Sequence, residues 1–104
     1  MHISFKLNKS QFEGFLRILS TATFDKNIMS GVQCEALKEL LWNLYSRLGR
    51  RLPNLKTSGN NIILSAAESW AIFMVYDYCW NDIKGTYEQQ LINYITGIIH
   101  QKTC

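Results

Sequence analysis

The chain has 104 residues, of which 47% are hydrophobic and 18% are charged, and its formal net charge is +3. This length corresponds to a single domain, residues 1–104, and the hydrophobic content excludes a disordered chain. Globular domains carry about 25% charged residues, so the low charge fraction leaves apolar surface that we expect to lie against a partner. A net charge of +3 is also far from the strongly basic balance of a dedicated nucleic-acid binder.

The cysteines and the short apolar runs indicate the compartment. Three cysteines, Cys34, Cys79 and Cys104, do not form a paired disulfide framework and are typical of a reducing cytoplasm. The N-terminal residues alternate between polar and apolar instead of forming the core of a signal peptide. The longest apolar stretch, residues 70–76, is far shorter than the roughly 20 residues that cross a bilayer. We therefore expect a cytoplasmic protein.

The first half of the chain is predicted to contain one strand and two helices. Residues 3–7 alternate with the period of a half-buried strand, and Asn8 with Gln11 has the spacing of a capping box that opens a helix. Residues 20–31 have the small and polar composition of a loop. The clearest helix runs from Val32 to Leu48. Its apolar stripe consists of Leu37, Leu40, Leu41, Leu44 and Leu48.

The second half repeats this order. After a loop that contains Pro53 and Gly59, residues 62–64 form a continuous apolar run that predicts a strand buried on both faces. Ser65 and Glu68 form a second capping-box pattern, which opens a helix over residues 66–80 that is apolar on nearly every side. Residues 81–86 interrupt the pattern, and a last helix continues to about residue 101.

The predicted fold is a helix-dominated α+β domain of four helices and two short strands in the order β-α-α-β-α-α. Residues 5–11 resemble residues 62–68, because in each segment a strand enters a capping box. An internal duplication with pseudo-two-fold symmetry explains this likeness, but any strand that enters a helix gives a similar pattern. Two short strands make a marginal sheet, so we expect them to pair beneath the helices or to continue across a dimer interface.

No pattern predicts a catalytic, metal or cofactor site. Cys79 lies in an apolar helix without a histidine near it in sequence, and we interpret it as a small core residue. His100 and Cys104 have the spacing of helical metal ligands, but zinc requires three or four ligands and the chain has no Cys-x-x-Cys pair. We therefore expect a protein that is not an enzyme, has no cofactor and acts by binding.

One segment is distinctly basic. No acidic residue lies between Glu39 and Glu68, whereas that interval contains cations that could contact phosphates, namely Arg47, Arg50, Arg51 and Lys56. A nucleic-acid-binding accessory protein is therefore one interpretation. The simpler interpretation is that the arginines complement the negative end of a helix dipole and that the loop is solvated. No recognition-helix or RNA-binding fingerprint accompanies the segment.

The aromatic residues favour self-association, which is the preferred interpretation at this level. Trp42 lies off the leucine stripe of its helix and Tyr45 lies at the edge of that stripe, and both residue types are enriched in interfaces. Taken alone, Trp42 is better explained by packing on the loop of residues 20–31. Ile72 and Val75 lie on the second apolar side of their helix, where another chain can cover them. The sequence thus predicts a small interaction or regulatory protein that forms a homodimer through these four residues.

Overall fold

A computed structural model describes residues 2–24, 32–79 and 86–103. Its elements are β1 (His2–Leu7), α1 (Lys9–Phe24), α2 (Val32–Gly49), the short 3-10 helix η1 (Leu52–Asn54), β2 (Asn60–Ser65), α3 (Ala66–Cys79) and α4 (Thr86–Thr103). The predicted order and the helix-dominated α+β class are confirmed. The predicted loop at residue 20 is wrong at its start, because α1 continues to Phe24 and buries Ala22 in the core.

β1 and β2 pair with each other in a two-stranded antiparallel sheet, in which Phe5 lies opposite Ile62 and Ser4 lies opposite Ile63. Alternate side chains of both strands, such as Phe5 and Leu64, enter the core. Ile63 on the other face is 50% exposed. The prediction that residues 62–64 are buried on both faces is therefore wrong, because the helices cover one face of the sheet only.

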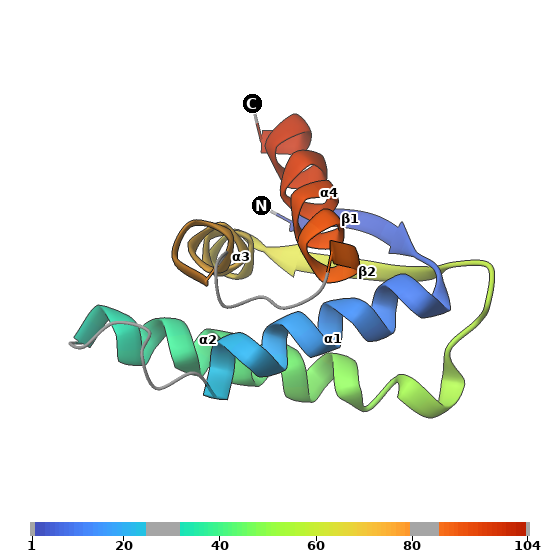
Figure 1. The fold of residues 1–104 in the computed structure, drawn as a ribbon, viewed down its shortest axis with the longest axis horizontal. Helices are drawn as coiled ribbons and strands as arrows, with labels where there is room; N and C mark the ends of the chain where they lie inside the picture. The colour runs from blue at the N-terminus through green and yellow to red at the C-terminus, as the bar shows by residue number, and fades with distance from the viewer. Residues whose placement is uncertain (1, 25–31, 80–85, 104) are drawn as a thin grey trace.

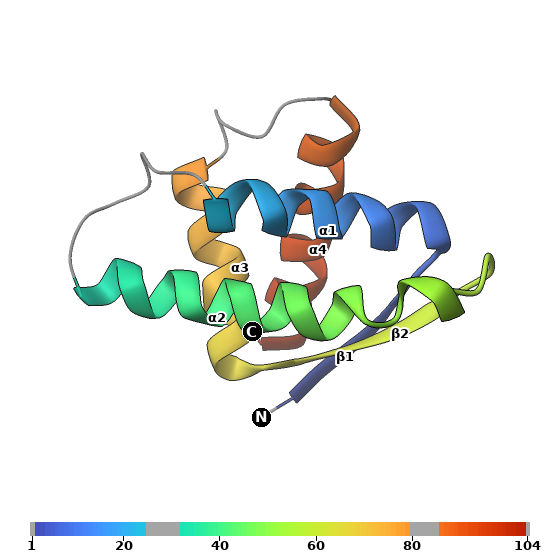
Figure 2. The same cartoon turned by 90° about the horizontal axis from the view of Figure 1, so that it is seen from below.

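The helices form two groups. α1 and α2 run side by side along the long axis of the molecule, and α3, α4 and the strands all lie on one side of that pair (Figure 1). Viewed from below, α3 and α4 cross behind α1 and α2 (Figure 2). The core lies between these groups and continues to the inner face of the sheet.

Both capping boxes are formed. The backbone N–H of Gln11 donates to Asn8 Oδ1 at 2.8 Å and that of Asn8 donates to Gln11 Oε1 at 3.0 Å. In the second half, the N–H of Glu68 donates to Ser65 Oγ at 3.2 Å and that of Ser65 donates to Glu68 Oε1 at 2.8 Å. Each box therefore turns the chain from a strand directly into a helix, α1 after β1 and α3 after β2.

The two halves are interleaved rather than separate. The first helix of each half packs against the second helix of the other half, α1 against α4 and α3 against α2. α1 and α4 approach closely at Gly14, where an added Cβ would lie 2.7 Å from Leu91 Cδ2. Each helix also packs against the other helix of its own half. The strand register, in which Phe5 lies opposite Ile62, agrees with a two-fold axis through the sheet, and the duplication stays a prediction.

None of the helices in the described ranges combines the length and apolar character that are needed to cross a membrane.

Candidate functional site

Two arginines of the basic segment cover the free edge of β2. Arg47 Nη2 donates to the carbonyl of Ile63 at 3.2 Å, and Arg51 Nη1 donates to the carbonyl of Asn61 at 2.6 Å. Arg47 Nη1 also lies 2.9 Å from the Glu68 carboxylate, which is itself buried. In the part of the chain that the structure describes, these carbonyls face no partner strand, so the arginines satisfy the backbone groups that an edge strand exposes.

Each of these arginines is also held in place. The Arg51 guanidinium lies 5.3 Å from the centre of the Phe12 ring, and Arg47 is fixed between Ile63 and Glu68. A guanidinium has five N–H donors, so both side chains keep donors for a further ligand. Their role differs from the predicted one, since they contact a strand edge instead of the carbonyls at the end of α2.

Arg50 and Lys56 are exposed. The loop that carries Lys56 is fixed by the buried side chain of Asn60, whose Nδ2 donates to the carbonyls of Leu7 and Lys56. Asn60 Oδ1 accepts the backbone N–H of Lys56 at 2.8 Å. The buried amide therefore positions Lys56 beside the end of the sheet.

The fold adds two cations that the sequence analysis missed. Lys102 Nζ at the end of α4 donates to the carbonyl of Ser4 at 2.5 Å, on the free edge of β1. Lys6 lies opposite Asn61 and is exposed on the outer face of the sheet. We define the cationic surface as the cations on this outer face, along its two edges, at the adjoining end of α2 and in the loop before β2, namely Lys6, Arg47, Arg50, Arg51, Lys56 and Lys102.

The carboxylates are distributed differently. α2 and α4 both end at the sheet, and a helix of 18 residues is about 27 Å long. Glu35 near the start of α2 and Glu88 near the start of α4 therefore lie far from the sheet, and Asp77 lies at the remote end of α3. Two carboxylates lie closer to the sheet. Glu68 pairs with Arg47, and Glu13 lies near the start of α1, which follows β1 directly. The molecule consequently has one predominantly cationic end.

A hollow of about 590 Å³ borders this surface at the edge of β2. Its lining includes Asn43, Arg47, Arg51, Asn61 and Glu68, together with His2 from β1. Guanidinium and amide donors therefore converge beside the outer face of the sheet, in an arrangement that suits an anionic ligand.

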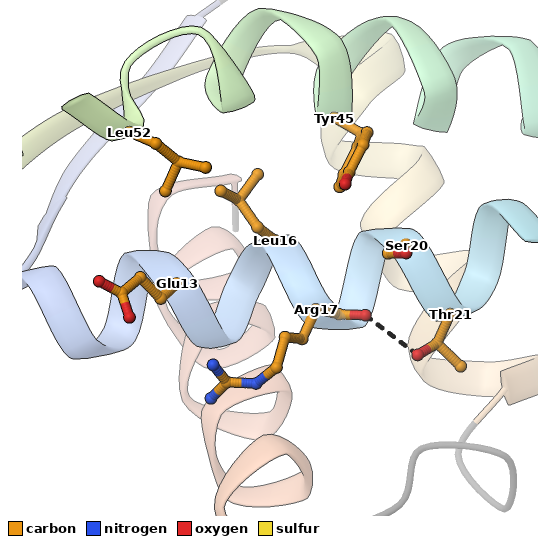
Figure 3. Close-up of a pocket in the computed structure, with 7 residues that line it drawn as sticks. All are labelled: Glu13, Leu16, Arg17, Ser20, Thr21, Tyr45 and Leu52. Carbon is orange, nitrogen blue, oxygen red and sulfur yellow. Dashed lines mark hydrogen bonds between the residues drawn. The ribbon is translucent and has the colours of Figure 1, made fainter.

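A second hollow, of about 600 Å³, lies between α1 and α2 (Figure 3). Leu16, Tyr45 and Leu52 provide its apolar surface, and polar side chains of α1 form its other side. Trp42 stacks on Tyr45 with the ring centres 6.0 Å apart and is 46% exposed. This groove with its neighbouring tryptophan is the second candidate site.

The four residues predicted to form a dimer interface are not together. Ile72 and Val75 are both 0% exposed, because the second apolar side of α3 packs on the core of the same chain. The prediction that these two lie on a surface is therefore wrong, and the exposed side of α3 carries Trp70 instead. Trp42 and Tyr45 remain accessible. The loop that Trp42 was expected to contact lies mostly outside the described residues.

Within the described ranges, no group of three or more His, Cys, Asp or Glu side chains is placed to hold a metal ion. Comparisons with protein-family models, with curated proteins and with solved structures gave no match.

Proposed function

We propose that this chain acts by binding a nucleic acid through the cationic surface. The observation that carries the proposal is the gathering of cations from both halves of the chain around one exposed sheet face, with Lys102 at one edge and Arg51 at the other. Glu35, Asp77 and Glu88 lie at the opposite ends of their helices. This separation explains how a chain with a net charge of only +3 can still present a field that attracts phosphates.

Some of these cations also bond to the sheet and others do not, so the two groups call for different variants. Arg47, Arg51 and Lys102 each make a hydrogen bond to a strand edge, so replacing them removes a contact with the sheet as well as a charge. Arg50 and Lys56 are exposed, and their side chains make no hydrogen bond within the part of the chain that the structure describes. Variants at Arg50 and Lys56 therefore test phosphate contact without disturbing the sheet.

Binding is measured by fluorescence anisotropy with labelled single- and double-stranded oligonucleotides at several salt concentrations. Contact between about four to six cations and phosphates gives a slope of log K against log salt of roughly −4 to −5 on a duplex. Arg50→Ala and Lys56→Ala together are expected to reduce that slope by about two contacts and to weaken binding about equally on all sequences.

Lys38→Ala is the matched control. Like Arg50→Ala, it removes one positive charge, but Lys38 lies about three turns before the end of α2, away from the sheet. We expect it to leave the affinity unchanged. If neither nucleic-acid form binds at low salt, or if Lys38→Ala weakens binding as much as Arg50→Ala, the proposal is wrong.

Self-association is a second candidate, favoured by the exposed Trp42 beside the α1–α2 groove. A two-fold interface is self-complementary, and this side of the molecule has both signs of charge, with Glu13 and Arg17 on α1. Light scattering over a range of concentrations tests the proposal. We expect a dimer that Trp42→Ala dissociates, whereas a monomeric mass at high micromolar concentration would remove this candidate.

Both candidates describe a binding protein, and neither requires a catalytic group or a cofactor. Either function is compatible with the cytoplasmic location that the cysteines predict.

A further inference from the structure

We infer, on the basis of the proposed nucleic-acid binding, that the ligand is duplex DNA and that the outer face of the β1–β2 ribbon enters its major groove. The side chains on this face are exposed, and most can donate or accept hydrogen bonds. They are His2, Ser4 and Lys6 from β1, with Asn61 and Ile63 from β2.

The shape of this part of the molecule fits the groove. The major groove of B-DNA is about 12 Å wide and admits a two-stranded antiparallel ribbon. Each strand has six residues, a length of about 20 Å, and the helices pack on the other face of the sheet. The outer face is therefore free to approach the base edges.

The outward side chains provide the chemistry of direct readout. A lysine can donate to the O6 and N7 acceptors of guanine, and an asparagine can form two hydrogen bonds with adenine. Lys6 and Asn61 lie opposite each other in the register, so they reach neighbouring base pairs. Ile63, 50% exposed, offers an apolar contact for the methyl group of thymine. Because the two strands differ in these residues, we expect the preferred site to be asymmetric.

Cations flank the ribbon on both sides, as the two phosphate backbones flank the groove. Arg47 and Arg51 lie along the β2 edge, and Lys102 lies along the β1 edge. Each of them keeps donors beyond its bond to the strand, and these can reach phosphate oxygens while the strand bond persists. The outer face carries no Phe, Tyr or Trp on β1 or β2 for stacking with unpaired bases, which favours a duplex over a single strand.

The test compares duplexes of the same sequence and length made of DNA and of RNA. The major groove of A-form RNA is deep and narrow and does not admit protein elements, although its phosphate charge is similar. We expect the protein to bind the DNA duplex at least about tenfold more tightly than the RNA duplex at equal salt. Prior methylation of guanine N7, which lies in the major groove, is expected to weaken binding to the DNA.

Two variants separate base contact from phosphate contact. A preferred site is first selected from a library of random DNA duplexes. Asn61→Ala is expected to weaken binding to that site by about tenfold and to leave binding to a random duplex nearly unchanged, because the backbone carbonyl that Arg51 contacts remains. Ile63→Ser tests a second position on the face, and far-UV circular dichroism confirms that each variant is folded. Arg50→Ala is expected to weaken binding to the preferred site and to the random duplex equally.

Each outcome decides between the two proposals. Equal affinity for DNA and RNA duplexes, or no effect of N7 methylation and of Asn61→Ala, would overturn groove binding while leaving nucleic-acid binding in place. Failure to bind either duplex or a single strand at low salt would overturn both.

Discussion

Among the glycines that the structure describes, Gly14 has the closest neighbours. It lies in α1 where that helix crosses α4, and a Cβ there would meet Leu91 Cδ2 at 2.7 Å and Tyr87 Cε1 at 2.9 Å. Leu91 is buried, so it has little room to move. The absence of a side chain at Gly14 therefore sets the distance between these two helices.

We predict that Gly14→Ala lowers the free energy of unfolding by about 1–3 kcal/mol, because the overlap with Leu91 outweighs the gain in helix propensity. Gly97→Ala is the control, since no atom lies within 4 Å of an added Cβ at this exposed position in α4. Gly97→Ala should raise the free energy of unfolding by up to about 1 kcal/mol. Urea denaturation measures both, and equal stabilisation by the two changes would contradict the packing argument.

The residues that the sequence predicted best are those with local partners. Asn8 and Gln11 are three positions apart, so their spacing alone determines that they can form a capping box. The partners of Arg47 and Arg51 were not predictable in this way, because Ile63 and Asn61 become neighbours only when β2 returns to the end of α2. Lys102 was missed for the same reason, since its partner Ser4 is at the other end of the chain.

At the scale of the elements, the two capping boxes perform the same task in each half. We predict that Asn8→Ala and Ser65→Ala each lower the free energy of unfolding by about 0.5–2 kcal/mol, because each change leaves helix N–H groups without their acceptor. The boxes lie at opposite ends of the sheet, so the effects of the two changes should add. Thermal denaturation measures the loss, with Ser58→Ala in the exposed loop as the control. A double variant that loses much less than the sum would show that the boxes are coupled.

The covered edge of β2 leads to another prediction at this scale. Replacing Arg47 and Arg51 by alanine exposes the carbonyls of Ile63 and Asn61, and a free edge pairs readily with a second strand. We expect the double variant to form larger species than the unchanged chain at the same concentration, as measured by sedimentation velocity. Arg50→Ala is the control for lost charge. Identical sedimentation of all three proteins would argue against edge protection.

The two largest differences from prediction, at residues 62–64 and in α3, have the same physical cause. The run at residues 62–64 and the all-round apolar α3 both indicate heavy burial, but periodicity does not show which neighbour covers each side. Ile63 is exposed because none of the described elements covers the outer face of the sheet, and Ile72 is buried because its own chain covers it. Composition predicted that some apolar surface would remain exposed, and only the tertiary arrangement assigns it to residues such as Trp42 and Trp70.

For the whole molecule, the packing of helices between the two halves predicts cooperative unfolding. α1 packs on α4 and α2 packs on α3 in addition to the contacts within each half, so both halves share one core. Trp42→Phe leaves tryptophans in the second half only, and its fluorescence should report the same urea midpoint as far-UV circular dichroism. The complementary variant carries Trp70→Phe and Trp80→Phe together, which leaves Trp42 in the first half, and both signals should again coincide. Two separate transitions would show that the halves are independent domains.

The architecture was predictable and the site was not. Alternation and capping boxes are local signals, and they were sufficient for the order of elements and for the fold class. The cationic surface depends on where the ends of α2 and α4 meet the sheet, which is a property of the complete fold. The basic segment indicated part of this surface, and Lys6 and Lys102 complete it.

The pairing of β1 with β2 has a consequence for the order in which the chain folds. His2 pairs with Ser65, so forming the sheet closes a loop that includes α1, α2 and everything between the two strands. Closing a loop of this length costs more conformational entropy than forming the local contacts of a helix. We therefore expect the helices to form first and the sheet to form late. The outer face of the ribbon therefore exists only in the fully folded chain. A ligand on that face stabilises the state in which the sheet is formed. It should therefore slow hydrogen exchange of the β1 amides more than that of the α1 amides.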